Sequence, residues 1–246
     1  MTWRLVAVVT AALLLLTDSA AGQHSATPGT STRSTRASGP AADSAAANAA
    51  TLGRASTPSA ISVWGAGSVH PGSVLGKISE GWVGLLGIRY HRRLLPRDAP
   101  PRPGREGPTL TYTADVVPLA IVSIPKGTGP GTSTSTIRSV KEAGLSTHGV
   151  GAYPIGLRVG FRSSANLRPF LAGHTGLLYL FAPLPDVRGR QLNFAVGVGA
   201  GVRIALVPHV ILTLGYRYHH LSNGFRGSIN PGLDANLLHL GLGVAP

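Results

Sequence analysis

Residues 192–204 read LNFAVGVGAGVRI, with an apolar side chain at almost every second position. Because successive side chains of a β-strand point to opposite faces, this segment would place Leu192, Phe194 and Val198 on one face. Asn193, Arg203 and three glycines would occupy the other face. The pattern predicts a strand with one apolar environment and one polar, crowded environment.

The same division recurs along the chain in segments of roughly ten residues, the dyad pattern typical of membrane β-barrels. The segment 170–181 is apolar on both faces, so its register stays open. Residues 192–204 and seven other segments give eight candidate strands, which is the smallest usual even number for such a barrel. The interior of a barrel of this size is filled by side chains. The other segments are residues 61–67, 82–91, 110–116, 153–162, 170–181, 210–218 and 237–244.

The polar faces distinguish two kinds of barrel. A soluble barrel of the lipocalin kind would place apolar residues inside and charges outside. Here the polar faces combine arginine with glycines, which suits a crowded polar lumen. We therefore predict an all-β fold, an eight-stranded antiparallel transmembrane β-barrel, with tyrosines at the membrane interfaces. The arginines expected in the lumen are Arg89, Arg158, Arg203 and Arg217, and the interfacial tyrosines are Tyr90, Tyr112, Tyr153, Tyr179, Tyr216 and Tyr218.

The N-terminal part has a different composition. Residues 1–22 have a positive charge at Arg4, an apolar core and small residues near Ala21, which predicts a secretory signal peptide. Residues 23–59 are rich in Ser, Thr, Ala and Pro, which predicts a disordered tail. The barrel is expected over residues 60–246. The chain has no cysteine, so its stability must come from the fold itself.

The connections between strands differ in length. Links around 69–81, 123–148, 182–190 and 223–235 are expected at the outer surface, and short turns around 163–168 and 206–208 at the inner surface. The long connection 96–108 departs from this trend, as a long inner turn or an error in the strand count.

Three residues near the C-terminus form a candidate hydrolytic site. His220 and Ser222 lie two positions apart on a strand and therefore project from the same face, as a base and its serine nucleophile require. Asp234 follows and shares the lipid-facing parity of the last strand. The structural alternative is that Ser-Asn-Gly and Asn-Pro-Gly form ordinary turns. His219 points to the other face and is expected in the lumen.

The motif His220-x-Ser222-Asn223-Gly224, followed by Asn230-Pro231-Gly232 and Asp234, resembles the C-terminal signature of the PagL-type lipid A 3-O-deacylases. Weaker likenesses lie at residues 62–65 and 115–119. These enzymes are outer-membrane barrels that hydrolyse an ester-linked acyl chain of lipopolysaccharide. The resemblance implies that Ser222 is the nucleophile, His220 the base and Asp234 the residue that orients the imidazole. It also implies that Asn223 and Gly224 belong to the oxyanion hole and that Asn230 supports the site.

Two features depart from that family. Its third catalytic position is usually glutamate, which is one methylene longer than Asp234. Outer-membrane barrels commonly end in an aromatic residue, whereas this chain ends at Pro246. These departures leave open a non-enzymatic small outer-membrane barrel, with a structural or adhesive role, as the alternative to a Ser/His/Asp ester hydrolase.

The formal charge of +13 arises from 22 Lys and Arg against 9 Asp and Glu. A positive charge of this size is typical of nucleic-acid binding, but the secreted barrel pattern argues against that partner, and the basic groups suit the phosphates of lipopolysaccharide. We expect an outer-membrane location, lipid A as substrate, no cofactor and no metal site, and we consider a homodimer as one oligomeric state. The basic residues of the expected outer loops are Lys77, Lys126, Arg138, Lys141, Arg188, Arg190 and Arg226.

Overall fold

The alternating segments form eight β-strands in the structure, a computed structural model that describes residues 59–71, 74–78, 80–94, 108–126, 139–140, 142, 144–161 and 166–244. The strands are β1 (Ser59–Pro71), β2 (Trp82–Arg93), β3 (Thr109–Ile124), β4 (Leu145–Gly160), β5 (Leu167–Leu184), β6 (Arg190–Val207), β7 (Val210–Ser222) and β8 (Leu233–Val244). The predicted signal peptide and all but the last residue of the predicted tail lie outside the described residues.

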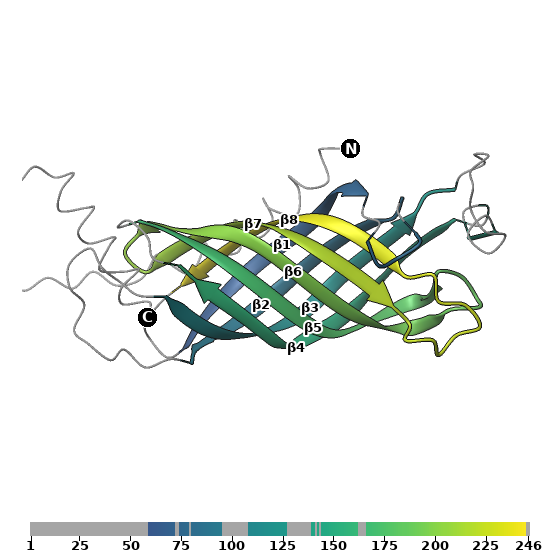
Figure 1. The fold of residues 1–246 in the computed structure, drawn as a ribbon, viewed down its shortest axis with the longest axis horizontal. Coiled ribbons are helices and arrows are strands. Elements are labelled where there is room, and N and C mark those ends of the chain that lie inside the picture. Colours follow the sequence, from purple (N-terminus) through teal and green to yellow (C-terminus); the bar gives the residue numbers. More distant parts are fainter. Residues whose placement is uncertain are drawn as a thin grey trace, which may run out of the picture.

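Each strand pairs antiparallel with its neighbours in sequence, and β1 pairs antiparallel with β8 to close the barrel (Figure 1). The predicted eight-stranded antiparallel barrel is confirmed. Closure pairs every strand on both sides and therefore leaves no open sheet edge. None of the helices in the described ranges is long and apolar enough to cross a bilayer.

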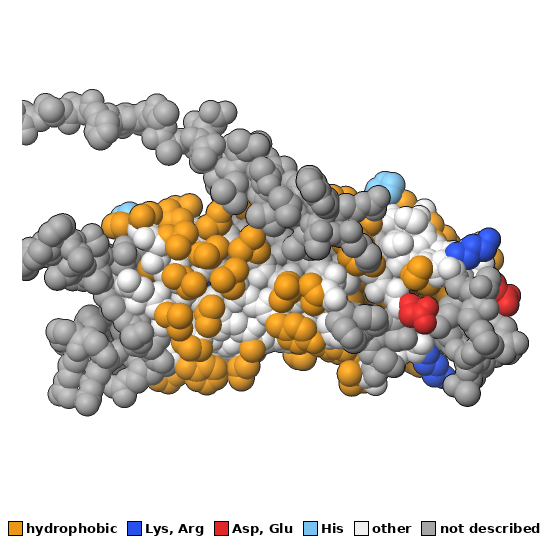
Figure 2. All heavy atoms as spheres, turned by 90° about the horizontal axis from the view of Figure 1, so that it is seen from above, with side chains coloured by type: hydrophobic (Ala, Val, Ile, Leu, Met, Phe, Trp, Pro, Cys, Tyr) orange, Lys and Arg blue, Asp and Glu red, His pale blue; other side chains and the backbone are white. Residues whose placement is uncertain are grey.

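The barrel wall divides the side chains as the alternation predicts. Leu157, Leu171 and Val198 are about half exposed on the outside, and Figure 2 shows hydrophobic side chains spread over the wall between the two ends. The structure also sets the register of residues 170–181, with Leu171 and Leu177 outside and His174 and Leu178 inside. An apolar outer belt of this kind is the surface that lipid covers.

The lumen holds the charged residues of the polar faces. Arg89, Arg158 and Arg217 are buried, as predicted, and Arg203 is partly buried. Arg89 and Asp115 are register partners across β2 and β3, and the guanidinium donates to both carboxylate oxygens, with Nε–Oδ1 at 2.5 Å and Nη2–Oδ2 at 2.8 Å. The lumen is therefore a packed polar interior.

One tyrosine prediction is wrong. Tyr153 is fully buried and packs in the lumen against His174 and His219, so it lies in no interfacial girdle. The register of β4 shifts between Ala152 and Ile155, where a β-bulge inserts one extra residue relative to both neighbouring strands. An extra residue reverses the facing of every side chain before it, so simple alternation from Leu157 back to Tyr153 gives the wrong face. His219 is buried in the lumen, as predicted.

The predicted strand count is correct, and β2 and β3 pair directly with each other. The long connection between these two strands is therefore a long turn and not an error in the count. The strands β1, β3, β5 and β7 all end at the same end of the barrel, on the right in Figure 1. We refer to this end as the site end, because the candidate site lies there. Its exposure at the outer surface stays a prediction.

Candidate active site

His220 and Asp234 are register partners across β7 and β8, so the sheet itself places their side chains side by side on the outer face. His220 Nδ1 lies 2.6 Å from Asp234 Oδ1. The imidazole is partly exposed, whereas the carboxylate is completely buried. The sequence pattern predicted the facing of Asp234 but not its burial.

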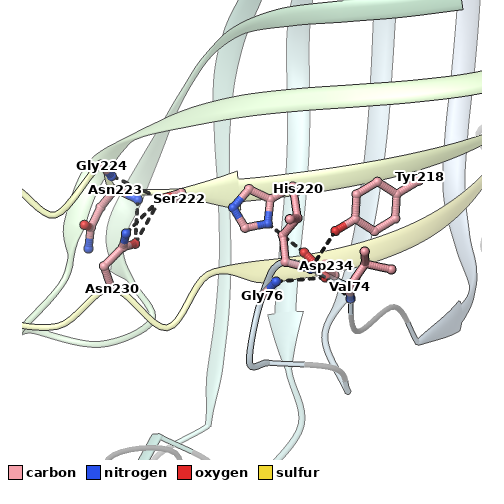
Figure 3. Close-up of polar contacts among 10 residues, drawn as sticks. Val74, Gly76, Tyr218, His220, Ser222, Asn223, Gly224, Asn230 and Asp234 are labelled. Carbon is pink, nitrogen blue, oxygen red and sulfur yellow. Dashed lines mark hydrogen bonds and ion pairs between the residues drawn. The ribbon is translucent and has the colours of Figure 1, made fainter.

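The burial of Asp234 comes from residues 74–78 of the link between β1 and β2, which we term the strap. The backbone N–H groups of Val74, Leu75 and Gly76 all donate to Asp234 Oδ2, at 2.7, 2.9 and 2.9 Å (Figure 3). A carboxylate buried away from water is tolerated only with such partners. The strap thus provides three donors to one oxygen and leaves the other oxygen to His220.

The strap is held against the start of β8 by backbone hydrogen bonds. Lys77 N–H donates to the Pro231 carbonyl at 2.7 Å, and Ile78 N–H donates to the Gly232 carbonyl at 3.1 Å. At Gly76 the approach is so close that a Cβ atom would lie 2.8 Å from Asp234 Oδ1 and 2.9 Å from the Gly232 carbonyl. A residue without a side chain is therefore required at this position.

Tyr218 adds a side chain to the same cluster from β7. Its hydroxyl hydrogen-bonds with Asp234 and accepts from Leu75 N–H at 3.2 Å. The carboxylate, which β8 carries, is thus held by β7 and the strap at once. A group fixed by several partners keeps its orientation during a reaction.

The Asp234 contact determines what the imidazole can do. An ionised carboxylate only accepts hydrogen bonds, so the proton must lie on His220 Nδ1 and the lone pair on Nε2. In Figure 3 this second nitrogen lies on the side of Ser222. The arrangement is that of a histidine prepared to accept a proton at Nε2 and to be stabilised as imidazolium by the carboxylate behind it.

Ser222 lies at the end of β7 and is bonded to the loop before β8. Its hydroxyl donates to Asn230 Oδ1 at 3.1 Å and accepts from Asn230 Nδ2 at 2.9 Å, and Gly224 N–H donates to it at 3.2 Å. Gly224 has a positive φ of 63°, and a Cβ there would meet the Phe194 ring at 2.6 Å. This turn requires glycine for both reasons.

Asn223 is placed differently from the other predicted residues. Its side-chain amide donates to the Ile229 carbonyl at 2.7 Å, and its backbone N–H donates to Asn230 Oδ1 at 3.1 Å. The side chain is buried beneath the loop. Asn223 therefore shapes the loop that carries Asn230, while Asn230 and Gly224 present their donors at the serine.

The structure brings the predicted residues together in two groups. His220 and Asp234 form one group, and Ser222, Asn223, Gly224 and Asn230 form the other. Within the described residues, no hydrogen bond joins Ser222 Oγ to the His220 imidazole. The two residues share one strand face, and their Cα atoms are about 6.6 Å apart at the usual strand rise. Rotation of the serine about χ1 moves its Oγ to a different staggered position.

The strap and Tyr218 are the site components that the sequence did not predict. The strap contributes backbone N–H groups, which every residue except proline carries, so no residue type marks them. Gly76 is the one sequence signal of its close approach. Tyr218 was predicted only as an interfacial tyrosine, and its link to Asp234 depends on side-chain direction at the strand end.

An apolar groove of about 270 Å³ crosses the same outer wall, nearer the middle of the barrel. Its lining includes Leu214 of β7 and Leu238 and Leu240 of β8, which share parity with His220 and Asp234. Small residues of β1, Gly65 and Gly67, lie between these leucines and the side chains of β2 and β3. The groove can hold a hydrocarbon chain on the lipid-facing side of the wall.

Comparisons with known proteins agree with the sequence motif. The family model described as lipid A 3-O-deacylase (PagL) matches residues 127–243, a range that contains β4 to β7, all but the last residue of β8 and the candidate site apart from the strap. No protein of curated function matches the chain.

Solved structures of three outer-membrane proteins are similar at low identity. The outer membrane enzyme PagL is 17% identical with a TM-score of 0.46, covering 74% of this chain and 97% of that chain. Neisserial surface protein A is 16% identical with a TM-score of 0.42, covering 77% and 98%. The N-terminal barrel domain of Pseudomonas aeruginosa OprF is 11% identical with a TM-score of 0.36, covering 76% and 97%.

The family match over residues 127–243 confirms the resemblance that the motif predicts, and the closed barrel with its apolar outer belt fits the membrane where that family resides. The chain is an outer-membrane β-barrel similar to the PagL family of lipid A 3-O-deacylases over the strands that carry its candidate site.

Proposed function

We propose that this barrel is a serine ester hydrolase that removes the 3-O-linked acyl chain from lipid A of lipopolysaccharide. The observation that carries the proposal is the His220–Asp234 contact of 2.6 Å, with Ser222 two residues further along the same strand face. The family match supports a deacylase, and the serine mechanism is supported by the motif and by the His220–Asp234 contact.

In the first step, Ser222 turns from Asn230 toward His220, and its Oγ attacks the ester carbonyl carbon. The hydroxyl proton passes to His220 Nε2, and Asp234 stabilises the resulting imidazolium. The carbonyl π-bond opens to give a tetrahedral oxyanion. Gly224 N–H and Asn230 Nδ2–H are the donors nearest the nucleophile, and each such donor contributes about 3 kcal/mol to transition-state stabilisation.

Collapse of the intermediate breaks the bond to the sugar 3-oxygen, which leaves as a hydroxyl with the proton from His220. The acyl group remains on Ser222. A water molecule, deprotonated by His220, then attacks the acyl ester and releases the fatty acid with regeneration of the serine. The released products are the 3-hydroxyl of lipid A and a free carboxylic acid.

The position of the site explains how a membrane-bound substrate could reach it. The groups lie on the outer wall at one end of the barrel, and the apolar groove lies on the same wall nearer the middle. An acyl chain in the groove would remain in the hydrocarbon layer while its ester reaches the level of Ser222. Extraction of the chain into water, at about 0.8 kcal/mol per CH₂ group, is then avoided.

The proposal is tested by mass spectrometry of purified lipid A incubated with the refolded chain in detergent. We expect loss of the mass of one ester-linked acyl chain, and no loss with Ser222→Ala or His220→Ala, since the two residues act as one unit. Ser228→Ala is the matched control, because Ser228 is an exposed serine in the same loop. Unchanged lipid A with the folded parent chain would favour the non-enzymatic barrel.

A further inference from the structure

Arg226, in the loop after Ser222, is held rigidly on the outer face next to the nucleophile. Its Nε donates to the Asn223 carbonyl at 3.0 Å and its Nη2 to the Leu192 carbonyl at 2.6 Å. The guanidinium also lies over the Phe194 ring, 4.9 Å from the ring centroid. Phe194 is the register partner of Ser222 across β6 and β7, so the cation lies beside the reactive serine.

Arg190 lies next to Arg226 and is connected to it through the backbone. Its Nε donates to the Arg226 carbonyl at 2.8 Å, and its two terminal nitrogens take no part in this hydrogen bond. Both arginines are exposed. Two guanidinium groups thus lie at the rim of the site. That of Arg226 is held by two backbone carbonyls, and that of Arg190 is bonded to the Arg226 carbonyl by a single hydrogen bond.

The nearby Arg188 shows how a structural arginine differs. It forms several hydrogen bonds with Asp186, including Nη2–Oδ2 at 2.6 Å, and this contact holds the pKa of Asp186 below its ordinary value. Among the residues that the structure describes, neither Arg190 nor Arg226 forms a salt bridge with a carboxylate. Their charge is therefore available to an anion from outside the protein.

We propose that Arg226, assisted by Arg190, binds a phosphate group of the glycolipid whose ester Ser222 attacks. The inference rests on the proposed function and names the headgroup feature that the site recognises. Guanidinium groups match the geometry of phosphate oxygens and form strong charged hydrogen bonds with them. Because Arg226 is already fixed by protein contacts, little side-chain entropy is lost when the phosphate binds.

The contacts favour the substrate's own phosphate over that of a neighbouring lipid. Arg226 is anchored through the carbonyl of Asn223, the residue that directly follows Ser222. A cation fixed to the nucleophile's own loop has a set position relative to the scissile ester, so a phosphate held there also orients that ester. Such orientation contributes to the rate only when both groups belong to one molecule.

The experiment measures kcat/KM for two substrates in a nonionic detergent: phosphorylated lipid A and the same lipid after enzymatic removal of its phosphates. We expect the parent chain to prefer the phosphorylated lipid. Arg226→Gln should reduce this preference about tenfold or more, as expected for loss of one charged hydrogen-bonding group. Arg190→Gln removes the assisting guanidinium, which donates one side-chain hydrogen bond within the described residues, and should reduce the preference by a smaller factor.

Arg92→Gln is the matched control, because Arg92 is an exposed arginine near the opposite end of β2. It should keep the preference of the parent chain. Arg226 also braces its loop, and a purely structural role would lower the rates for both lipids by the same factor. That outcome, or a preference that follows added anionic phospholipid instead of the substrate's phosphate, would overturn the inference.

A binding measurement separates this inference from the proposed function. Calorimetric titration of the Ser222→Ala chain with the two lipids requires no turnover. A preference for the phosphorylated lipid that falls in the Ser222→Ala/Arg226→Gln double variant supports the phosphate site even if the parent chain releases no acyl group. Equal binding of both lipids by the Ser222→Ala chain contradicts it even if deacylation is observed.

Discussion

The barrel contains two carboxylates that each face a cationic or basic partner across neighbouring strands, one in the lumen and one on the outer wall. Asp115 is the register partner of Arg89, and Asp234 is the register partner of His220. The closest contacts are nearly equal, at 2.5 and 2.6 Å. Strand pairing alone therefore brings both pairs together.

The difference lies in what each carboxylate does with its second oxygen. Arg89 occupies both oxygens of Asp115, so the charges satisfy each other and nothing is left for chemistry. Asp234 gives one oxygen to His220 and the other to the strap. The strap fixes the carboxylate without occupying the imidazole, and His220 keeps one nitrogen for a substrate. Because the strap binds the second oxygen of Asp234, the carboxylate can orient His220 without occupying both of its ring nitrogens.

The largest effect is expected for Asp234→Asn. If the amide oxygen faces the strap donors, the NH₂ group faces His220 Nδ1 and forces it to accept. The proton then lies on Nε2, and the imidazole cannot act as a base. We expect turnover of lipid A to fall about a thousandfold or more while the barrel stays folded. A rate within a few-fold of the parent chain would leave at most a Ser222–His220 dyad.

The corresponding substitution in the lumen should lower the stability of the barrel and leave the turnover unchanged. Asp115→Asn leaves the buried Arg89 without its charged partner, which costs about 3 kcal/mol or more of folding free energy. Turnover of the folded fraction should not change, because neither residue contacts the site. Urea unfolding in lipid vesicles measures the stability, with Asp186→Asn, in a partly buried loop pair, as the control. Lower turnover of Asp115→Asn with the stability of the parent chain would contradict the difference between the lumen pair and the outer pair.

The two regions also differ in how far the sequence predicts them. Alternation predicted the lumen arginines and the shared face of His220 and Ser222, because facing depends on strand period alone. It failed at Tyr153, where a bulge adds one residue that no composition signal marks. It could not show the strap, whose donors are backbone groups, or the turn of Ser222 toward Asn230, which depends on a side-chain rotamer.

A smaller effect is expected when the strap is displaced but the carboxylate is kept. In Gly76→Ala, the new Cβ would lie 2.8 Å from Asp234 Oδ1, so the strap must move away and weaken its hydrogen bonds. Loss of one charged hydrogen bond, about 1.5 kcal/mol, predicts roughly a tenfold lower kcat. Lys77→Ala is the control, since its exposed side chain lies on the same strap. Equal rates for both variants would mean that the strap only covers the carboxylate.

The smallest effect, and the sharpest test of the strap, is expected for Asp234→Glu. Glutamate is the usual residue of the family at this position, so the sequence alone favours activity that is retained or raised. The structure predicts a moderate loss, because Asp234 Oδ2 already lies 2.7 to 2.9 Å from three N–H groups of the strap, and an additional methylene has no room without displacing them. Overpacking of this kind costs about 1 to 3 kcal/mol when the neighbours cannot yield.

Because the strap is a link rather than a strand, part of that cost should be relieved by movement, and we expect kcat to fall less than about tenfold. The double variant Asp234→Glu/Gly76→Ala distinguishes the two interpretations. If the longer carboxylate displaces the strap, the strap's contribution is already lost, and Gly76→Ala should add little to the effect of Asp234→Glu. Fully additive losses, or a higher kcat in Asp234→Glu alone, would show that the carboxylate is oriented by His220 and Tyr218 without help from the strap.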